Sequence, residues 1–87
     1  MTQGQTIAKH LLHYLTTPTA RSTASIFGVE AIEACGDIYL RLLRQAPPKI
    51  RDVQKWVHAN AKYHLRHYLI RDAHARLHPL QAEEQMP

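Results

Sequence analysis

The chain of 87 residues contains little cysteine, glycine or aromatic side chain. Its one cysteine, Cys35, excludes an internal disulfide, and its place in an apolar run predicts a reduced, buried thiol. The three glycines form no Gly-rich phosphate loop, and no His-Glu-x-x-His motif or nucleophile elbow is present. We therefore expect a protein without enzymatic activity and without a cofactor.

Long apolar runs are missing as well. No window approaches the roughly 18–20 apolar residues that span a membrane. The polar start, Met1 to Thr6, has neither the basic segment nor the apolar stretch of a signal peptide. No run alternates apolar and polar residues, and no Asn-Gly or Asp-Gly turn occurs. These absences predict an all-α, cytoplasmic protein that makes no membrane contact.

Proline and glycine divide the chain into segments with helical periodicity. Pro18 disfavours a helical residue before it, and Gly28 can adopt a left-handed turn without steric cost. Pro47 and Pro48 end one helix and can begin the next, because proline is tolerated in a first turn. Three of the predicted helices cover residues 5–15, 30–45 and 48–78, and a short one between the first two is capped by Thr19 or Ser22 and ends near Phe27. The apolar face predicted for the third helix consists of Ile32, Cys35, Ile38, Tyr39, Leu42 and Leu43.

The last predicted helix is about 45 Å long, more than the width of a small three-helix core. We therefore expect part of it to project, to bend near Asn60, or to pack against a second chain. Residues 1–46 are expected to form a three-helix core, residues 47–79 a long basic helix of the same domain, and residues 80–87 a flexible tail.

Positive charge is concentrated in one part of the sequence. The net charge is +4 with histidine neutral. Residues 1–40 have two basic and three acidic side chains, giving −1, and residues 41–78 have nine basic and two acidic ones, giving +7. The last nine residues have two acidic side chains, giving −2. A segment as basic as the middle one attracts polyanions such as nucleic acid, and the alternative is a solvated helix that keeps the protein soluble.

The last predicted helix has three faces at the helical period. One is an apolar seam expected to pack on the first three helices: Ile50, Val53, Val57, Ala61, Leu65 and Tyr68. The second, which we call the seven-residue seam, predicts a homodimer or partner interface, unless both seams meet one broad core. Its residues are Trp56, Tyr63, Ile70 and Leu77. The third is the basic stripe of Arg51, Lys55, His58, Lys62 and Arg66, to which Arg76 returns farther along.

The segment RSTASIFGVEAIEACGDIY, residues 21–39, resembles the helix-turn-helix of small DNA-binding regulators from phages and plasmids. Ala24 matches the small residue where the two helices cross, and Gly28 matches the turn glycine. The apolar anchors of the motif are matched by Val29, Ala34 and Ile38. The resemblance implies a helix-turn-helix-like core and binding of operator DNA. The sequence departs from the family in one respect. Where members of the family present polar or basic side chains to base edges, this chain has three acidic residues: Glu30, Glu33 and Asp37.

The leading hypothesis is a small dimeric, repressor-like transcriptional regulator that binds double-stranded DNA. The residues expected to contact DNA are Arg21, Ser22, Thr23, Arg41, Arg44, Lys49, Arg51, Lys55, Lys62 and Arg66. The alternative is a small inhibitor or adaptor that docks on a host protein complex, which the acidic third helix and the aromatic Trp56 and Tyr63 favour. Sequence-independent binding of RNA or single-stranded nucleic acid ranks third, because the tyrosines flank the basic stripe and do not lie on it.

Seven histidines raise the question of a metal site. Zinc requires about four converging ligands. Four of the histidines, however, spread over about 20 Å of the last helix: His64, His67, His74 and His78. We expect solvated histidines and no metal, with a site at His74 and His78 shared across a dimer as the alternative.

Overall fold

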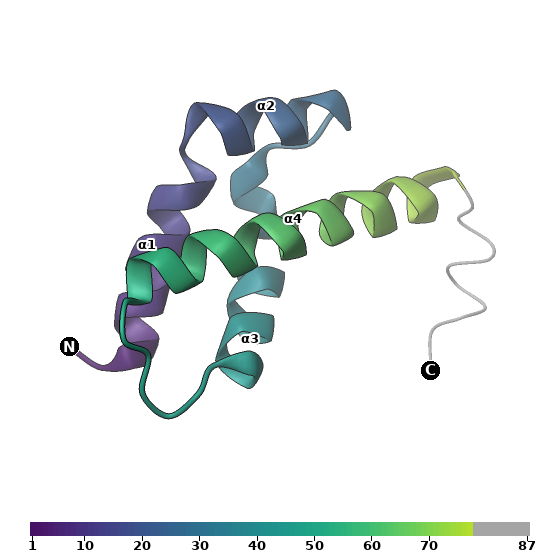
Figure 1. Ribbon diagram of the computed structural model, residues 1–87. Coiled ribbons are helices and arrows are strands. Elements are labelled where there is room, and N and C mark those ends of the chain that lie inside the picture. The colour runs from purple at the N-terminus through teal and green to yellow at the C-terminus, as the bar shows by residue number, and fades with distance from the viewer. Residues whose placement is uncertain (78–87) are drawn as a thin grey trace.

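The computed structural model describes residues 1–77. Within them the fold is all-helical, with no strand, which confirms the predicted class. Figure 1 shows α4 lying across the other helices. The elements are α1 (Gln3–Leu15), α2 (Pro18–Ile26), the short 3₁₀ helix η1 (Ala31–Ala34), α3 (Cys35–Gln45) and α4 (Val53–Leu77).

Threonine caps set the start of the first two helices. The Thr2 hydroxyl accepts a hydrogen bond from the Gln5 amide, and the Gln5 side chain accepts one from the Thr2 amide, at 3.1 and 2.8 Å. This capping box begins α1 two residues before the predicted start. Thr17 caps α2 through the Ala20 amide, with Pro18 in the first turn, where its missing N–H costs no hydrogen bond.

Gly28 turns the chain between α2 and η1. Its φ is +72°, a left-handed conformation that glycine adopts without a Cβ penalty. The Gly28 amide donates to the Ser25 carbonyl at 2.9 Å, and the Val29 amide donates to the Ala24 carbonyl at 3.1 Å. These two bonds form a Schellman motif, which satisfies the last carbonyls of α2. The chain then enters η1 and α3, so the predicted third helix is present, with a 3₁₀ first turn.

The predicted start of the last helix at Pro48 is wrong, because α4 begins at Val53. Asp52 provides the cap: its carboxylate accepts a hydrogen bond from the Lys55 amide at 3.1 Å. The preceding loop is tied to α1 by the side chain of Gln3. That side chain donates to the Pro47 carbonyl and accepts from the Ile50 amide, both at 2.8 Å.

Helix α4 is one uninterrupted α-helix through Asn60, without the break considered there. Its 25 residues span about 37 Å. The far end is attached to the rest of the molecule, since the Arg76 guanidinium donates to the Phe27 carbonyl at the end of α2, at 2.7 Å. A cation at this position also interacts favourably with the negative end of the α2 dipole. His78 lies outside the described residues.

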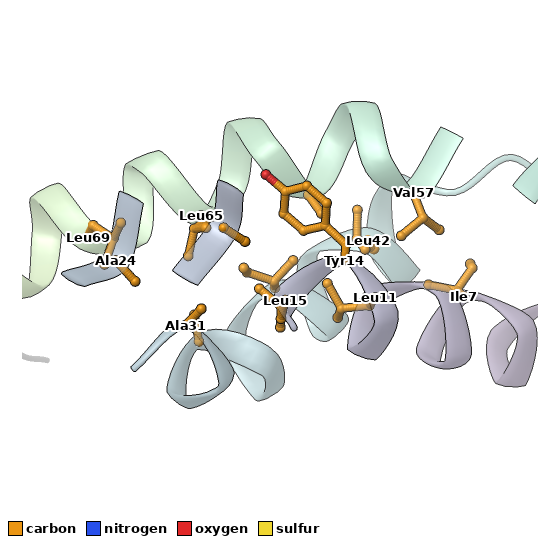
Figure 2. Packing of buried hydrophobic residues seen from close by; sticks show 14 residues of the cluster. Ile7, Leu11, Tyr14, Leu15, Ala24, Ala31, Leu42, Val57, Leu65 and Leu69 are labelled. Carbon is orange, nitrogen blue, oxygen red and sulfur yellow. The ribbon is translucent and has the colours of Figure 1, made fainter. Parts of the chain in front are cut away.

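One cluster of buried apolar side chains joins all the helices (Figure 2). It consists of Ile7, Leu11, Tyr14, Leu15, Ala20, Ala24, Ala31, Ala34, Ile38, Leu42, Val57, Ala61, Leu65 and Leu69. The α4 members follow one another at four-residue spacing, which turns the buried line by about 40° at each step. Leu69 therefore takes the position that the sequence assigned to Tyr68, which is only half-buried. Ile50 and Val53 pack at the edge of the cluster.

Helix α3 and η1 are apolar on two sides. Ile38 and Leu42 are fully buried, whereas Ile32, Leu40 and Leu43 remain 46, 56 and 40% exposed. Ile32 and Leu43, which the sequence places on the apolar face of this helix, are outside the buried cluster, whose members on η1 and α3 are Ala31, Ala34, Ile38 and Leu42.

Candidate nucleic-acid interface

The outer face of α4 presents three cations along one line. Lys55, Lys62 and Arg66 are exposed, and their spacing of seven and four residues keeps them on one side of the helix. Within residues 1–77 none of them has an ion-pair partner. Arg51 is exposed in the loop that precedes the start of α4. These four side chains, which we call the α4 cations, are the part of the basic stripe that remains open to solvent.

His58 was predicted in the basic stripe but turns toward α1. Its ring stacks on His13, with centroids 5.9 Å apart and planes 16° apart, and it contacts the Tyr14 ring at 5.4 Å. Its Nε2 atom is buried and has no hydrogen-bond partner among residues 1–77. His58 therefore fills the junction of α1 and α4 and does not extend the α4 cations.

A shallow depression lies beside the α4 cations. It is lined by Ala59, Lys62, Tyr63, Arg66 and His67. The Tyr63 ring is exposed and leans on His67, with centroids 4.3 Å apart. Ala59 and His67 were missed in the sequence, although their spacing of four residues from Tyr63 places them next to it. This depression combines a small side chain, two cations and an aromatic ring, so it can bind a phosphate together with a stacked base or sugar.

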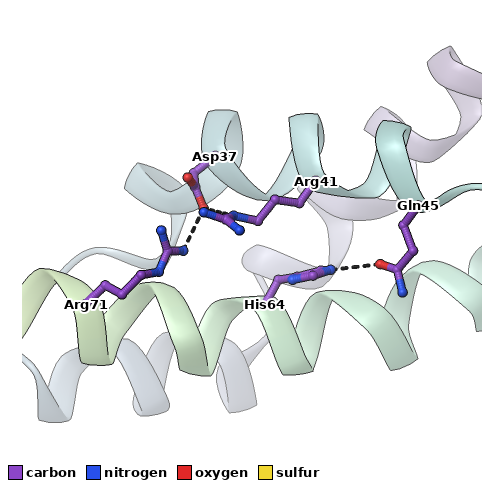
Figure 3. A network of polar contacts seen from close by, with 5 residues as sticks. All are labelled: Asp37, Arg41, Gln45, His64 and Arg71. Atoms are coloured by element: carbon purple, nitrogen blue, oxygen red, sulfur yellow. Dashed lines mark hydrogen bonds and ion pairs between the residues drawn. The ribbon is translucent and has the colours of Figure 1, made fainter. Parts of the chain in front are cut away.

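Two of the other basic side chains on α3 and α4 are paired with one carboxylate, that of Asp37 (Figure 3). The Asp37 carboxylate is 2.9 Å from the Arg41 guanidinium and 3.1 Å from that of Arg71. Burial raises the pKa of Asp37, but the hydrogen bonds from Arg41 and Arg71 outweigh it, and the pKa lies below its ordinary value. Arg41, a predicted DNA contact, is therefore part of a bridge between α3 and α4.

A neutral hydrogen-bond chain continues this junction. The Gln45 amide group donates to the Asn60 side chain at 3.0 Å, and its oxygen is hydrogen-bonded to the His64 ring at 2.9 Å (Figure 3). Burial lowers the pKa of His64, and so do the nearby charges of Arg41 and His67. The ring is consequently held in its neutral form at this contact.

Arg76, predicted to return to the basic stripe, is also engaged. Its Nε is 3.1 Å from the Asp72 carboxylate, and the same guanidinium bonds to the Phe27 carbonyl. Arg76 fixes the end of α4 against α2 and is not counted among the α4 cations.

The remaining predicted DNA contacts lie on other surfaces. Arg21 and Ser22 are exposed on α2, where they line an open groove that also contains Glu30 and Glu33. The Thr23 hydroxyl is used within α2, donating to the Thr19 carbonyl at 2.9 Å. Two more cations are exposed at the end of α3 and in the next loop: Arg44 and Lys49. The predicted set is thus divided among α2, α3, α4 and the loop between α3 and α4, and only its α4 members form a line.

The seven-residue seam is open except at its first residue. Trp56 packs at the edge of the core, whereas Tyr63, Ile70 and Leu77 are 61, 51 and 76% exposed. Helix α4 therefore does not bury both of its apolar seams in one intramolecular core. The exposed members lie next to the α4 cations on the outer face of the helix.

Cys35 is partly buried, less than predicted, and burial raises the pKa of its thiol. A raised pKa keeps the thiolate fraction low at neutral pH, which disfavours nucleophilic chemistry. Across residues 1–77 no group of three histidine, cysteine or acidic side chains is arranged to hold a metal ion. The alternative site at His74 and His78 involves a residue outside the described part.

No described helix combines the length and the apolarity needed to cross a membrane. Comparisons of the chain with protein-family models, with curated proteins and with solved structures give no match.

Proposed function

We propose that this protein binds double-stranded DNA through the outer face of α4. The observation that carries the proposal is the line formed by Lys55, Lys62 and Arg66, which are exposed, share one helix face and have no carboxylate partner within residues 1–77. These cations are the largest group of unneutralised positive side chains on one element of the described structure. Duplex DNA presents one negative charge per about 1.7 Å of axis, so such a line meets several phosphates at once.

The spacing of the cations fits backbone contacts. Lys55 and Arg66 are about 16 Å apart along the α4 axis, with Lys62 between them. Their long side chains adjust to neighbouring phosphates, as lysine and arginine do in sequence-independent binding. Three such contacts predict a slope of about −3 for the logarithm of affinity against the logarithm of salt concentration. Arg51 adds about one further unit if it also reaches a phosphate.

We include a helix-turn-helix-like arrangement of α2, η1 and α3 in the proposal. Ala24, Ala34 and Ile38 are fully buried, and Gly28 has the left-handed turn conformation that the resemblance implies. The outward side of α3, however, offers Leu40 and an exposed glycine where base reading needs hydrogen-bond donors and acceptors. We therefore assign DNA contact to α4. Phosphate contacts position a protein without specifying sequence, so operator recognition and repressor-like regulation stay predictions.

Docking on a host protein is the second candidate function. The observation that favours it is the exposure of Tyr63, Ile70 and Leu77 beside Arg66 on α4. Tyrosine and arginine are enriched among the residues that dominate protein interfaces. On this reading the same face of α4 contacts a protein surface, and DNA affinity is negligible at every salt concentration.

Fluorescence anisotropy of labelled random duplex DNA, titrated at several salt concentrations, tests the proposal. The variant with Lys55→Glu and Lys62→Glu has its net charge lowered from +4 to zero. The matched control, Lys9→Glu with Thr19→Glu and Ser25→Glu, has the same net charge but leaves α4 and the other predicted DNA contacts unchanged. We expect the α4 variant to lose roughly tenfold or more of the affinity and most of the salt dependence, and the control to lose much less.

Equal losses in the two variants would show general attraction by net charge and would reject the α4 face. Absence of wild-type binding at low salt would reject DNA binding and favour the protein partner. Circular dichroism of both variants establishes that the helices are retained.

A further inference from the structure

The outward side of α3 is apolar and unoccupied within residues 1–77. Leu40 is 56% exposed there, on the opposite side of the helix from the buried Ile38 and Leu42, and Ile32 is exposed on the preceding η1. A helix with two apolar sides is expected to have two packing partners. The core supplies only one of them.

Gly36 lies in the middle of this side. A Cβ atom added to Gly36 would meet no other atom within 4 Å, so nothing in the chain itself requires a glycine at this position. Glycine inside a helix is less favourable than alanine, but it allows another backbone or side chain to approach closely. One turn farther on, Leu40 projects from the same side of α3. The helix therefore presents a gap and a matching protrusion four residues apart.

Charges at the two ends of this side are opposite. Glu30 and Glu33 are exposed at the beginning, and Arg44 is exposed at the end. None of these three side chains forms an ion pair within residues 1–77. Glu33 in η1 and Arg44 in α3 are eleven residues apart along consecutive helical turns, about 16 Å, so they cannot neutralise each other within one chain.

We propose that the outward side of α3 is a homodimer interface in which two copies of α3 pack antiparallel about a two-fold axis. Leu40 of each copy fills the space over Gly36 of the other, and Glu33 of each copy lies beside Arg44 of the other. The pattern is self-complementary, which is the property that an isologous two-fold interface requires. If the partner were a different protein, nothing would require this chain to have both a gap at Gly36 and a protrusion at Leu40 that fits it.

This surface differs from the seven-residue seam, which the sequence singled out for self-association. It also leaves the α4 cations accessible, because α3 packs along the side of α4 that carries Asn60, His64 and Arg71. Lys55 and Lys62 lie on the other side of the outer face, next to His58 and α1. The proposal does not rest on DNA binding.

Sedimentation velocity of the full chain over a range of concentrations tests the proposal. We expect a species of about 20 kDa, twice the chain mass of 10.0 kDa. Leu40→Asp and Gly36→Arg should each give a monomer with an unchanged helical spectrum, because Leu40 is 56% exposed and a Cβ at Gly36 would meet no atom within 4 Å. Ile70→Asp is the matched control on the seven-residue seam, with a starting side chain exposed to a similar degree.

A charge variant tests the antiparallel register. Arg44→Glu places a carboxylate beside Glu33 of the second copy and should weaken the dimer by roughly tenfold. Adding Glu33→Gln removes that repulsion and retains an acceptor for the Glu30 amide, which now bonds to Glu33 at 3.1 Å. The double variant should therefore recover part of the lost affinity.

A wild-type chain that remains monomeric at about 100 µM would overturn the proposal. A dimer that survives Leu40→Asp but is lost in Ile70→Asp would move the interface to the seven-residue seam and overturn it as well. The DNA titration measures a different property, so failure of the dimer proposal is distinguishable from failure of the proposed DNA binding.

Discussion

His64 is the residue whose surroundings have the clearest effect on its chemistry. It lies between α4 and α3, with its ring hydrogen-bonded to Gln45 and with Arg41 and His67 nearby. Burial and these positive charges lower its pKa, against the smaller opposite effect of Asp37. The folded protein therefore binds fewer protons at this site than the unfolded chain does, in the range just below the ordinary pKa of histidine.

We predict that the free energy of unfolding falls as the pH is lowered through about 6.5, where the unfolded chain takes up the His64 proton. The loss levels off below the folded-state pKa. Asp37 contributes in a separate and more acidic range, because its lowered pKa gives stability that is present above about pH 4 and lost as the pH falls further. Urea unfolding between about pH 7.5 and 5 measures the first effect.

The matched pair for this measurement is His64→Gln and His10→Gln. His64→Gln keeps a hydrogen-bonding side chain and removes the titrating ring, so its stability should depend less on pH than that of the wild type. His10→Gln, on α1, should leave the slope nearly unchanged. Identical slopes in wild type and His64→Gln would contradict the assignment.

For single residues, the sequence predicts which side chains are exposed better than it predicts which side chains contact one another. Lys55, Lys62 and Arg66 lie on one exposed face, as the helical period indicates. The pairing of Asp37 with Arg71 joins residues 34 positions apart, and it depends on how α3 meets α4. His58 lies at the edge of the predicted stripe, where contact with α1 decides its direction. Such contacts depend on tertiary packing, which the helical period of one segment does not describe.

The helices and turns depend on two glycines in opposite ways. Gly28 has a φ of +72° in the Schellman turn after α2, whereas Gly36 is an ordinary helical residue with open space around it. We predict that Gly28→Ala destabilises the fold by about 1 kcal/mol, because alanine is strained at positive φ. Gly36→Ala should stabilise it by about 0.5–1 kcal/mol, because alanine is the better helix former.

Urea unfolding of both variants in a Leu40→Asp background provides the comparison, since that background removes any contribution from association. Changes of the same sign in the two variants would be inconsistent with the turn geometry described here.

Element boundaries followed from the sequence wherever a local cap decides them. Pro18 and Gly28 mark the start and the end of α2 to within a residue or two. The start of α4 was not predictable in this way, because Pro48 and Asp52 are both acceptable beginnings of a helix. The side chain of Gln3, more than forty residues away, holds the proline segment in a non-helical path. The outward apolar side of α3 could not be predicted either, because helical periodicity alone does not tell which of two apolar sides packs against the core.

In the molecule as a whole, the core is unevenly distributed. Helix α2 contributes only two buried side chains, Ala20 and Ala24, whereas α1 and α4 contribute larger ones such as Leu11 and Leu65. Apolar stabilisation scales with buried area, so α2 is held to the core by a small fraction of it. Close packing of alanines brings α2 near α4 but gives it little free energy of attachment.

We predict that α2 opens locally without unfolding of the rest. Amide hydrogen exchange should show lower protection in residues 20–26 than in the central turns of α1 and α4. The variant Arg76→Gln removes the bond to the Phe27 carbonyl and should lower protection in α2 further, with little change in α1. Equal protection in all helices would mean that the molecule opens only as one unit.

Helix α4 comes last in the chain but supplies Val57, Ala61, Leu65 and Leu69 to the centre of the core. The ribosome makes α1, α2 and α3 before these residues, so a chain that lacks them leaves the apolar sides of the three helices without a packing partner. Chains interrupted before about residue 69 therefore expose Leu11, Leu15 and Leu42, the kind of surface that chaperones and proteases recognise. Only chains that include α4 as far as Leu69 can form this core, and products that stop earlier are left open to degradation.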